Sequence, residues 1–120
     1  MARHEASVQE RITLEPSRTP LRARVGDKVV AESAHALILH ETGYPDRVYF
    51  PRADVRMELL EPSRHRTRCP WKGEAAYWSL NLGGERRENA AWAYMTPIPG
   101  MEPIAGRLCF GDAATIEPAK

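Results

Sequence analysis

No stretch of the sequence approaches the ~18 consecutive apolar residues that a membrane-spanning helix needs, which excludes such a helix. Cysteine is scarce as well, since Cys69 and Cys109 are the only two. Two thiols permit at most one intramolecular disulfide, and no signal-like segment opens the chain, so we expect reduced cysteines in a cytoplasmic protein. An excess of charge is also missing, because 17 basic residues face 16 acidic ones for a net charge of +1. This balance argues against nucleic acid or acidic membranes as partners.

A long helical period is absent too, whereas turn-forming residues are frequent, with ten prolines and eight glycines among 120 residues. The segments between them alternate apolar and polar residues with the period of two that is typical of strands. We therefore predict a mainly β fold of compact antiparallel sheets, with residues 1–10 as a polar N-terminal arm and residues 11–120 as a single β domain. The predicted strands are 11–16, 21–25, 28–32, 36–40, 47–50, 63–68, 74–82, 85–94 and 107–110.

One segment, residues 54–60, carries a short helical pattern in which Val55 and Leu59 share a face. Asp54 is placed to cap such a helix. Pro62 limits its length, so a single turn or an irregular connector is the alternative.

Four blocks of residues stand in an order that resembles a known family. They are Tyr49-x-Pro51-x-x-Asp54-Val55, Thr67-x-Cys69-Pro70-x-Lys72-Gly73-x-Ala75-x-Tyr77-Trp78, Ala91-Trp92-x-Tyr94-x-x-Pro97, and Ile104-x-Gly106 before Phe110. Over about residues 20–110 the sequence resembles the bacterial and fungal family called domain of unknown function 427, also labelled nucleotidyltransferase-like. The resemblance implies a β fold of the Mss4-like (β-tent) kind, with two sheets meeting over a cleft, and it names no reaction. The early Trp and the aromatic, acidic C-terminal segment common in that family are missing here.

The segment Cys69-Pro70-Trp71-Lys72-Gly73 is close to the zinc knuckle Cys-Pro-x-Cys-Gly found in β-tent proteins. Lys72 stands where the knuckle has its second thiolate, and the chain has no other Cys-x-x-Cys pair. We therefore expect no metal site and no cofactor, and a knuckle turn in which the Lys72 ammonium takes the place of the metal.

Cys69 has two interpretations. It is a nucleophile if Lys72 and the neighbouring arginines hold it as a thiolate, with His40 or His65 as general base. Alternatively, it is a small hydrophobic residue that packs the turn. Lys72 and Glu74 lie two residues apart, so they either pair on the surface or flank a ligand.

The Arg64-His65-Arg66-Thr67-Arg68 run places three arginines on one strand face and His65 and Thr67 on the other. Such a stripe either contacts phosphate or is a solvated face neutralised by nearby glutamates. The sequence has no glycine-rich phosphate loop and no paired aspartates for two cations, so we do not expect nucleotidyl transfer.

Three function hypotheses remain open. The first is a domain that binds a small anionic or aromatic molecule in a pocket of thiol, amine and aromatic groups. The second is an enzyme of the transferase or hydrolase type, with Cys69, Lys72 and Asp54 as catalytic candidates. The third is an interaction module that forms a homodimer through its edge strands. The predicted pocket residues are Tyr49, Asp54, Cys69, Lys72, Glu74, Tyr77, Trp78, Trp92 and Tyr94.

Overall fold

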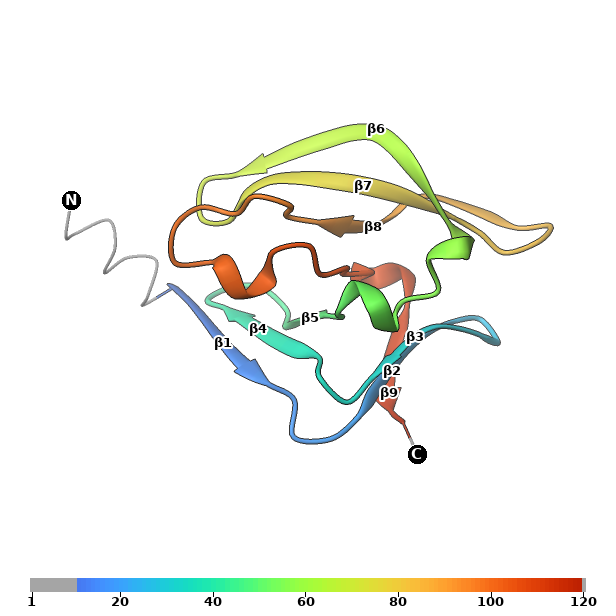
Figure 1. Ribbon diagram of the computed structural model, residues 1–120, viewed down its shortest axis with the longest axis horizontal. Coiled ribbons are helices and arrows are strands. Elements are labelled where there is room, and N and C mark those ends of the chain that lie inside the picture. The colour runs from blue at the N-terminus through green and yellow to red at the C-terminus, as the bar shows by residue number, and fades with distance from the viewer. Residues whose placement is uncertain (1–10, 120) are drawn as a thin grey trace.

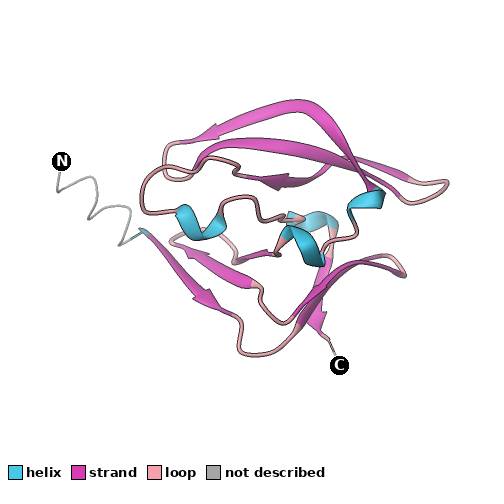
Figure 2. Ribbon diagram, viewed as in Figure 1, coloured by secondary structure: helices cyan, strands magenta, loops and turns pink. Residues whose placement is uncertain are grey.

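Nine strands and four short 3₁₀-helices form the part of the chain that the computed structural model describes, residues 11–119. The predicted arm at residues 1–10 lies outside this range. The strands make three antiparallel sheets of three strands each, so the predicted mainly β fold is confirmed (Figures 1 and 2). Three sheets replace the two that the resemblance implied, and the Mss4-like assignment stays a prediction. No helix within residues 11–119 is long and apolar enough to cross a membrane.

Each sheet combines segments that are distant in the sequence. The first has the order β1 (Ile12–Pro16), β4 (Leu37–Glu41), β5 (Arg47–Tyr49). The second has the order β3 (Lys28–Ser33), β2 (Leu21–Val25), β9 (Thr115–Pro118). The third has the order β6 (Leu60–Cys69), β7 (Gly73–Asn81), β8 (Arg86–Ala93), and it lies along the top of Figure 1. The 3₁₀-helices are η1 (Arg52–Asp54), η2 (Met57–Leu59), η3 (Glu102–Ile104) and η4 (Gly111–Ala113).

The segment after β8 joins the third sheet to the first. In Figure 1 it runs between β6–β8 above and β4–β5 below. The predicted strand at residues 107–110 was wrong, because these residues form no continuous strand. Leu108 and Cys109 each make one isolated bridge, to Phe50 and Trp92 respectively. The segment has no continuous partner strand, because its two neighbours belong to different sheets.

The predicted helix at residues 54–60 is replaced by η1 and η2, as the alternative of a turn or connector anticipated. Val55, between the two 3₁₀-helices, is extended and bridges to Ala31 of β3. This tertiary pairing outweighs a weak helical tendency over so few residues. Asp54 caps no helix, and its carboxylate instead accepts a hydrogen bond of 2.6 Å from the Ser33 hydroxyl.

Strand β9 was not predicted, because the end of the sequence has little apolar alternation. It pairs with β2, where Glu117 receives hydrogen bonds from Arg22 at 2.6 Å and from Arg24 at 3.1 Å. The hydrogen bonds from Arg24 and Arg22 lower the pKa of Glu117 from its ordinary 4.5 to about 2. The one sequence signal for this strand was the β-branched pair Thr115-Ile116.

This ion cluster makes stability depend on pH. Because the pKa of Glu117 in the folded protein lies below its ordinary value, its contribution is complete above pH 4.5 and is lost as the pH falls toward 2. We expect Glu117→Gln to lower the unfolding free energy at pH 7, with a smaller difference from wild type at pH 3, both measured by urea denaturation. Glu88→Gln, at an exposed position of β8, is the control for the loss of one carboxylate and should change the unfolding free energy at pH 7 by no more than about 0.5 kcal/mol. An equal loss at both pH values would contradict the assignment to the Glu117 carboxylate.

Candidate functional site

The turn Cys69–Gly73 connects β6 to β7 and is held by backbone contacts on two sides. The Lys72 amide donates to the Cys69 carbonyl at 3.2 Å, and the Ile98 amide donates to the Lys72 carbonyl at 3.0 Å. Gly73 has φ of +119°, and a Cβ there would lie 3.4 Å from the Pro97 Cα. The turn therefore needs glycine at this position to lie against residues 96–98.

A hollow of about 480 Å³ opens beside this turn. Its walls come from the turn itself, from the end of β4 and the loop that follows, and from β5 and β8. It is lined by Arg11, Glu41, Tyr44, Pro45, Arg47, Tyr49, Arg68, Cys69, Pro70, Trp71, Lys72, Trp92 and Tyr94. Five of the nine predicted pocket residues are therefore brought together: Tyr49, Cys69, Lys72, Trp92 and Tyr94.

The other four predicted pocket residues lie elsewhere. Asp54, the last residue of η1, accepts its hydrogen bond from Ser33. Glu74 lies on the opposite side of the turn, in a second hollow with two arginines of β6. The Tyr77 hydroxyl lies 3.0 Å from Thr67 Oγ1, within hydrogen-bond distance. Trp78 is buried in the larger core cluster. None of the four lines the hollow beside the turn.

The predicted arginine stripe of β6 forms only in part, because the register is irregular between Pro62 and Arg66, where Arg64 lies. Arg66 and Arg68 pair in register with Ala76 and Glu74, and both line the second hollow with them. His65 packs edge-on against Tyr77, with 4.6 Å between ring centroids.

The strongest polar contact in the hollow joins Lys72 to Glu41. Lys72 Nζ donates to Glu41 Oε1 at 2.9 Å, and the two side chains are only 11% and 10% exposed. Arg11 Nε lies 3.6 Å from the other Glu41 oxygen. The prediction that Lys72 would pair with or stand beside Glu74 was wrong, because Lys72 belongs to the turn and strand alternation begins only at Gly73. No local pattern pointed to Glu41 as the partner, because it lies 31 residues away in the sequence.

Three cationic side chains of the hollow lie over aromatic rings. Arg47 lies 5.7 Å from the Trp92 ring centroid, and Arg11 lies 5.0 Å from that of Trp71. The Lys72 ammonium is 6.0 Å from the ring of Tyr94. Contacts of this kind favour a cation on an aromatic face when water is partly excluded. Arg47 and Trp71 therefore belong to the site, although the sequence did not place them in the pocket.

Two buried phenols form the inner wall. The Trp92 indole donates to the Tyr49 hydroxyl at 3.3 Å. Burial raises the pKa of Tyr49 and of Tyr94 above the ordinary value of 10, so both hydroxyls stay protonated at neutral pH. Behind them, burial raises the pKa of Cys109 to about 12, which keeps it an inert thiol. The inner wall therefore adds no negative charge to the hollow.

Cys69 is half-buried at the edge of the hollow, and neither histidine proposed as its base lines this space. His40 lies between Asp46, at 2.8 Å, and Glu15, at 3.0 Å. His65 packs on Tyr77. Within residues 11–119, no group of three or more His, Cys, Asp or Glu side chains is placed to hold a metal ion. The hollow therefore does not bring either proposed general base to Cys69.

Comparison with known families identifies the chain. It belongs to the family described as Domain of unknown function (DUF427), whose model, NTP_transf_9, matches residues 13–117. The match confirms the resemblance and extends it into β1 and β9, beyond the predicted core of about residues 20–110. No curated protein matched the sequence.

We expect a large coupling between Lys72 and Glu41 in the free energy of unfolding. Lys72→Met should lower the unfolding free energy by about 3 kcal/mol, because it leaves a buried carboxylate without its hydrogen-bonded partner. Adding Glu41→Leu should recover most of this loss, as measured by urea denaturation of both single variants and the double variant. The exposed Arg56–Glu58 pair is the control and should show little coupling. Additive losses at Lys72 and Glu41 would show that the pair is not formed.

Gly111 fixes the position of the Trp92 ring. A Cβ at Gly111 would lie 2.6 Å from the Trp92 ring, and its φ is +53°. Gly111→Ala should therefore cost about 1–3 kcal/mol through both backbone strain and displacement of the ring. Gly26→Ala separates the two causes, since Gly26 has φ of +59° and open space around the added Cβ. Equal losses of unfolding free energy in the two variants would rule out the contact with Trp92.

Proposed function

We propose that the hollow beside the Cys69–Gly73 turn binds a small anionic molecule that carries a flat ring. One observation supports this most strongly. Among the residues that the structure describes, the lining includes four cationic side chains and a single carboxylate, and aromatic rings lie among them. The cations are Arg11, Arg47, Arg68 and Lys72, and the carboxylate is Glu41.

The charge imbalance favours an anion. Glu41 offsets one of the four positive charges, and the buried phenols of Tyr49 and Tyr94 are neutral. Positive potential concentrates in a recess with low-dielectric walls, so an anion gains more there than on an open surface. The whole chain has a net charge of only +1, so the excess of cations in the lining is local.

The rings favour a flat partner. Trp71, in the turn after β6, and Trp92, on β8, both line the hollow. Tyr44 lines it as well and is 61% exposed. Exposed aromatic side chains are enriched where proteins bind ligands, because one face is apolar and the edge is polar. A planar anion would satisfy both the cations and the rings.

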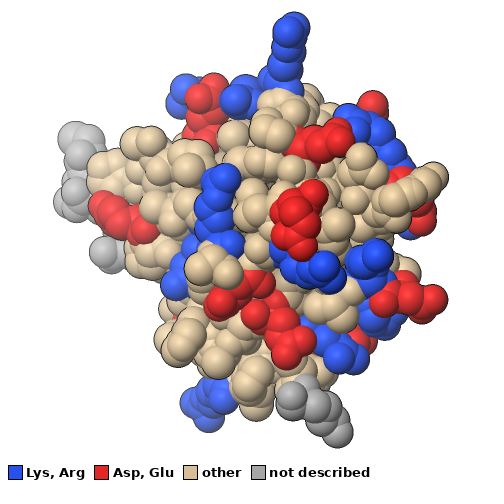
Figure 3. Space-filling model, turned by 45° about the vertical axis from the view of Figure 1, so that its right-hand side comes forward, with Lys and Arg blue, Asp and Glu red and all other residues tan. Residues whose placement is uncertain are grey.

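Other functions have less support. The short name NTP_transf_9 suggests nucleotidyl transfer, but within residues 11–119 Glu41 is the only carboxylate lining the hollow, and it is already bonded to Lys72. Figure 3 shows acidic and basic side chains interspersed over the visible face, without the basic stripe that nucleic acid binding requires. At β6, Arg66 covers the carbonyls of Ser63 and His65. This protects part of the sheet edge that a homodimer would pair.

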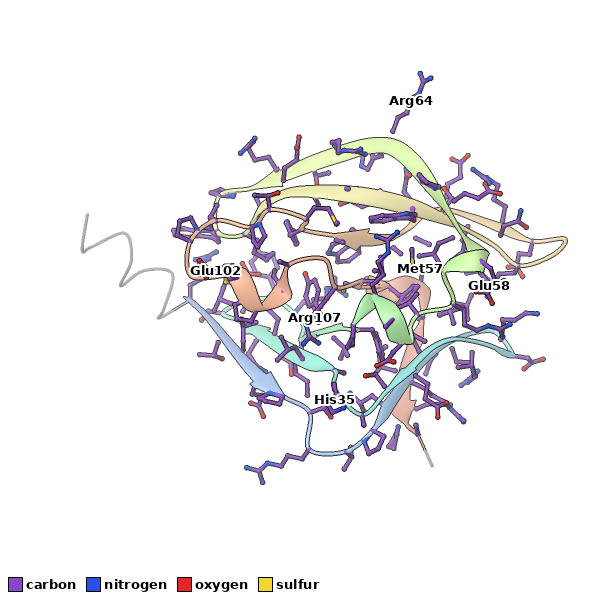
Figure 4. The ribbon with its side chains drawn as sticks, viewed as in Figure 1. His35, Met57, Glu58, Arg64, Glu102 and Arg107 are labelled. Carbon is purple, nitrogen blue, oxygen red and sulfur yellow. The ribbon has the colours of Figure 1, made fainter. Side chains whose placement is uncertain are left out.

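Two arginines of β6 provide a matched test. Arg68 lines the hollow, whereas Arg64 points away from the molecule (Figure 4). We expect phenyl phosphate and benzoate to bind, and Arg68→Gln to weaken both by about fivefold, the value of an exposed charge pair near 1 kcal/mol. Isothermal titration calorimetry should show wild-type affinity in Arg64→Gln, which changes the net charge equally. The neutral analogue benzyl alcohol should bind more weakly to all three proteins.

Two results would contradict the proposal. One is the absence of binding by either aryl anion to the wild-type protein. The other is an equal loss in Arg64→Gln and Arg68→Gln, which would indicate attraction by overall charge without a site.

A further inference from the structure

The four cations of the hollow differ in how firmly they are neutralised. Lys72 and Arg11 share Glu41, whose side chain is 10% exposed. Within residues 11–119, Arg68 makes no ion pair. Arg47 pairs through Nη1 with Asp112 at 3.1 Å, and Asp112 is 92% exposed. Among the described ion pairs, therefore, Arg47 is the one cation of the hollow whose partner carboxylate lies almost wholly in water.

Asp112 reaches Arg47 because of the geometry of η4. The helix begins at Gly111, whose Cα lies so close to the Trp92 ring that a Cβ would not fit. Arg47 lies over the same ring. Trp92 thus holds the guanidinium and the start of η4 together, and Asp112 is the next residue along the chain.

We propose that Asp112 is an exchangeable counter-ion and that the anionic group of the ligand displaces it from Arg47. This inference rests on the proposed function of the hollow. Both groups are oxyanions. The displaced one is the Asp112 carboxylate, and the one that binds is a carboxylate or a phosphate of the ligand. Arg47 is the residue that fixes the position of that oxyanion.

The exchange costs little at Asp112 and adds hydrogen bonds at Arg47. Asp112 returns to water at little cost, because it is hardly desolvated in the pair. Displacing Glu41 from Lys72 would instead leave two buried charges unpaired. Asp112 uses a single hydrogen bond from Arg47, whereas a free carboxylate or phosphate can take two from one guanidinium. The ring of a bound aryl anion would then lie toward Trp92.

The test compares two substitutions that remove the same charge. Asp112→Asn frees Arg47, whereas Asp46→Asn removes a neighbouring carboxylate that pairs with His40 and forms no ion pair with Arg47 within residues 11–119. We expect Asp112→Asn to lower the Kd for benzoate and phenyl phosphate by about two- to fivefold, the range of exposed ion pairs. Asp46→Asn should leave the Kd within about 1.5-fold of wild type, and Arg47→Lys should raise it, since lysine cannot bind an oxyanion through two parallel bonds.

A second readout follows the displaced side chain. In carbon-detected NMR, the Asp112 carboxyl signal should move during titration with benzoate, while the Asp46 signal stays in place. The two aryl anions distinguish carboxylate from phosphate as the preferred group by their relative Kd values.

The outcomes separate this inference from the proposed function. If the wild-type protein binds but Asp112→Asn has no effect, or if Asp46→Asn tightens binding equally, then displacement is wrong and the hollow remains a binding site. If neither anion binds any variant, both proposals fail.

Discussion

The buried ion pair between Lys72 and Glu41 is the contact around which the site is organised. It links the turn after β6 to the end of β4, and so connects the third sheet to the first across the hollow. Both side chains are about one-tenth exposed, so neither charge is well solvated without the other. The pair therefore contributes more to holding the two sheets in one arrangement than to net stability.

Under the function proposed above, the same pair decides which charges a ligand would meet. Glu41 holds Lys72 and lies near Arg11, which leaves Arg47 and Arg68 to meet an incoming anion. In that proposal, the buried Lys72–Glu41 pair keeps the hollow preorganised, and the weakly neutralised Arg47 and Arg68 meet the ligand. The cost of desolvation is met during folding, so little is added when an anion enters.

The sequence predicted the local parts of this account well. Alternation and turn residues located eight of the nine strands, because a half-buried strand has a recognisable period. The motif blocks also identified Tyr49, Cys69, Lys72, Trp92 and Tyr94, which converge on one hollow.

Contacts between residues far apart in the sequence could not be predicted from local patterns. Glu41 and Arg47 flank a turn that looks like an ordinary surface loop, and only the packing of β4 and β5 under the third sheet gives them a role. Trp78 sits beside Tyr77 in the same aromatic motif, but it is buried in the core, because adjacent strand residues face opposite sides. The missed strand β9 is likewise stabilised by distant arginines on β2.

One spectrum tests the central contact directly. The sequence has three lysines, so the side-chain ¹⁵N signals are few enough to assign. If Lys72 is buried against Glu41, its ammonium protons should exchange slowly and give a resolved ¹⁵N–¹H correlation at neutral pH, which disappears in Glu41→Gln. A Lys72 signal that exchanges as fast as that of an exposed lysine, and that Glu41→Gln does not change, would contradict the account.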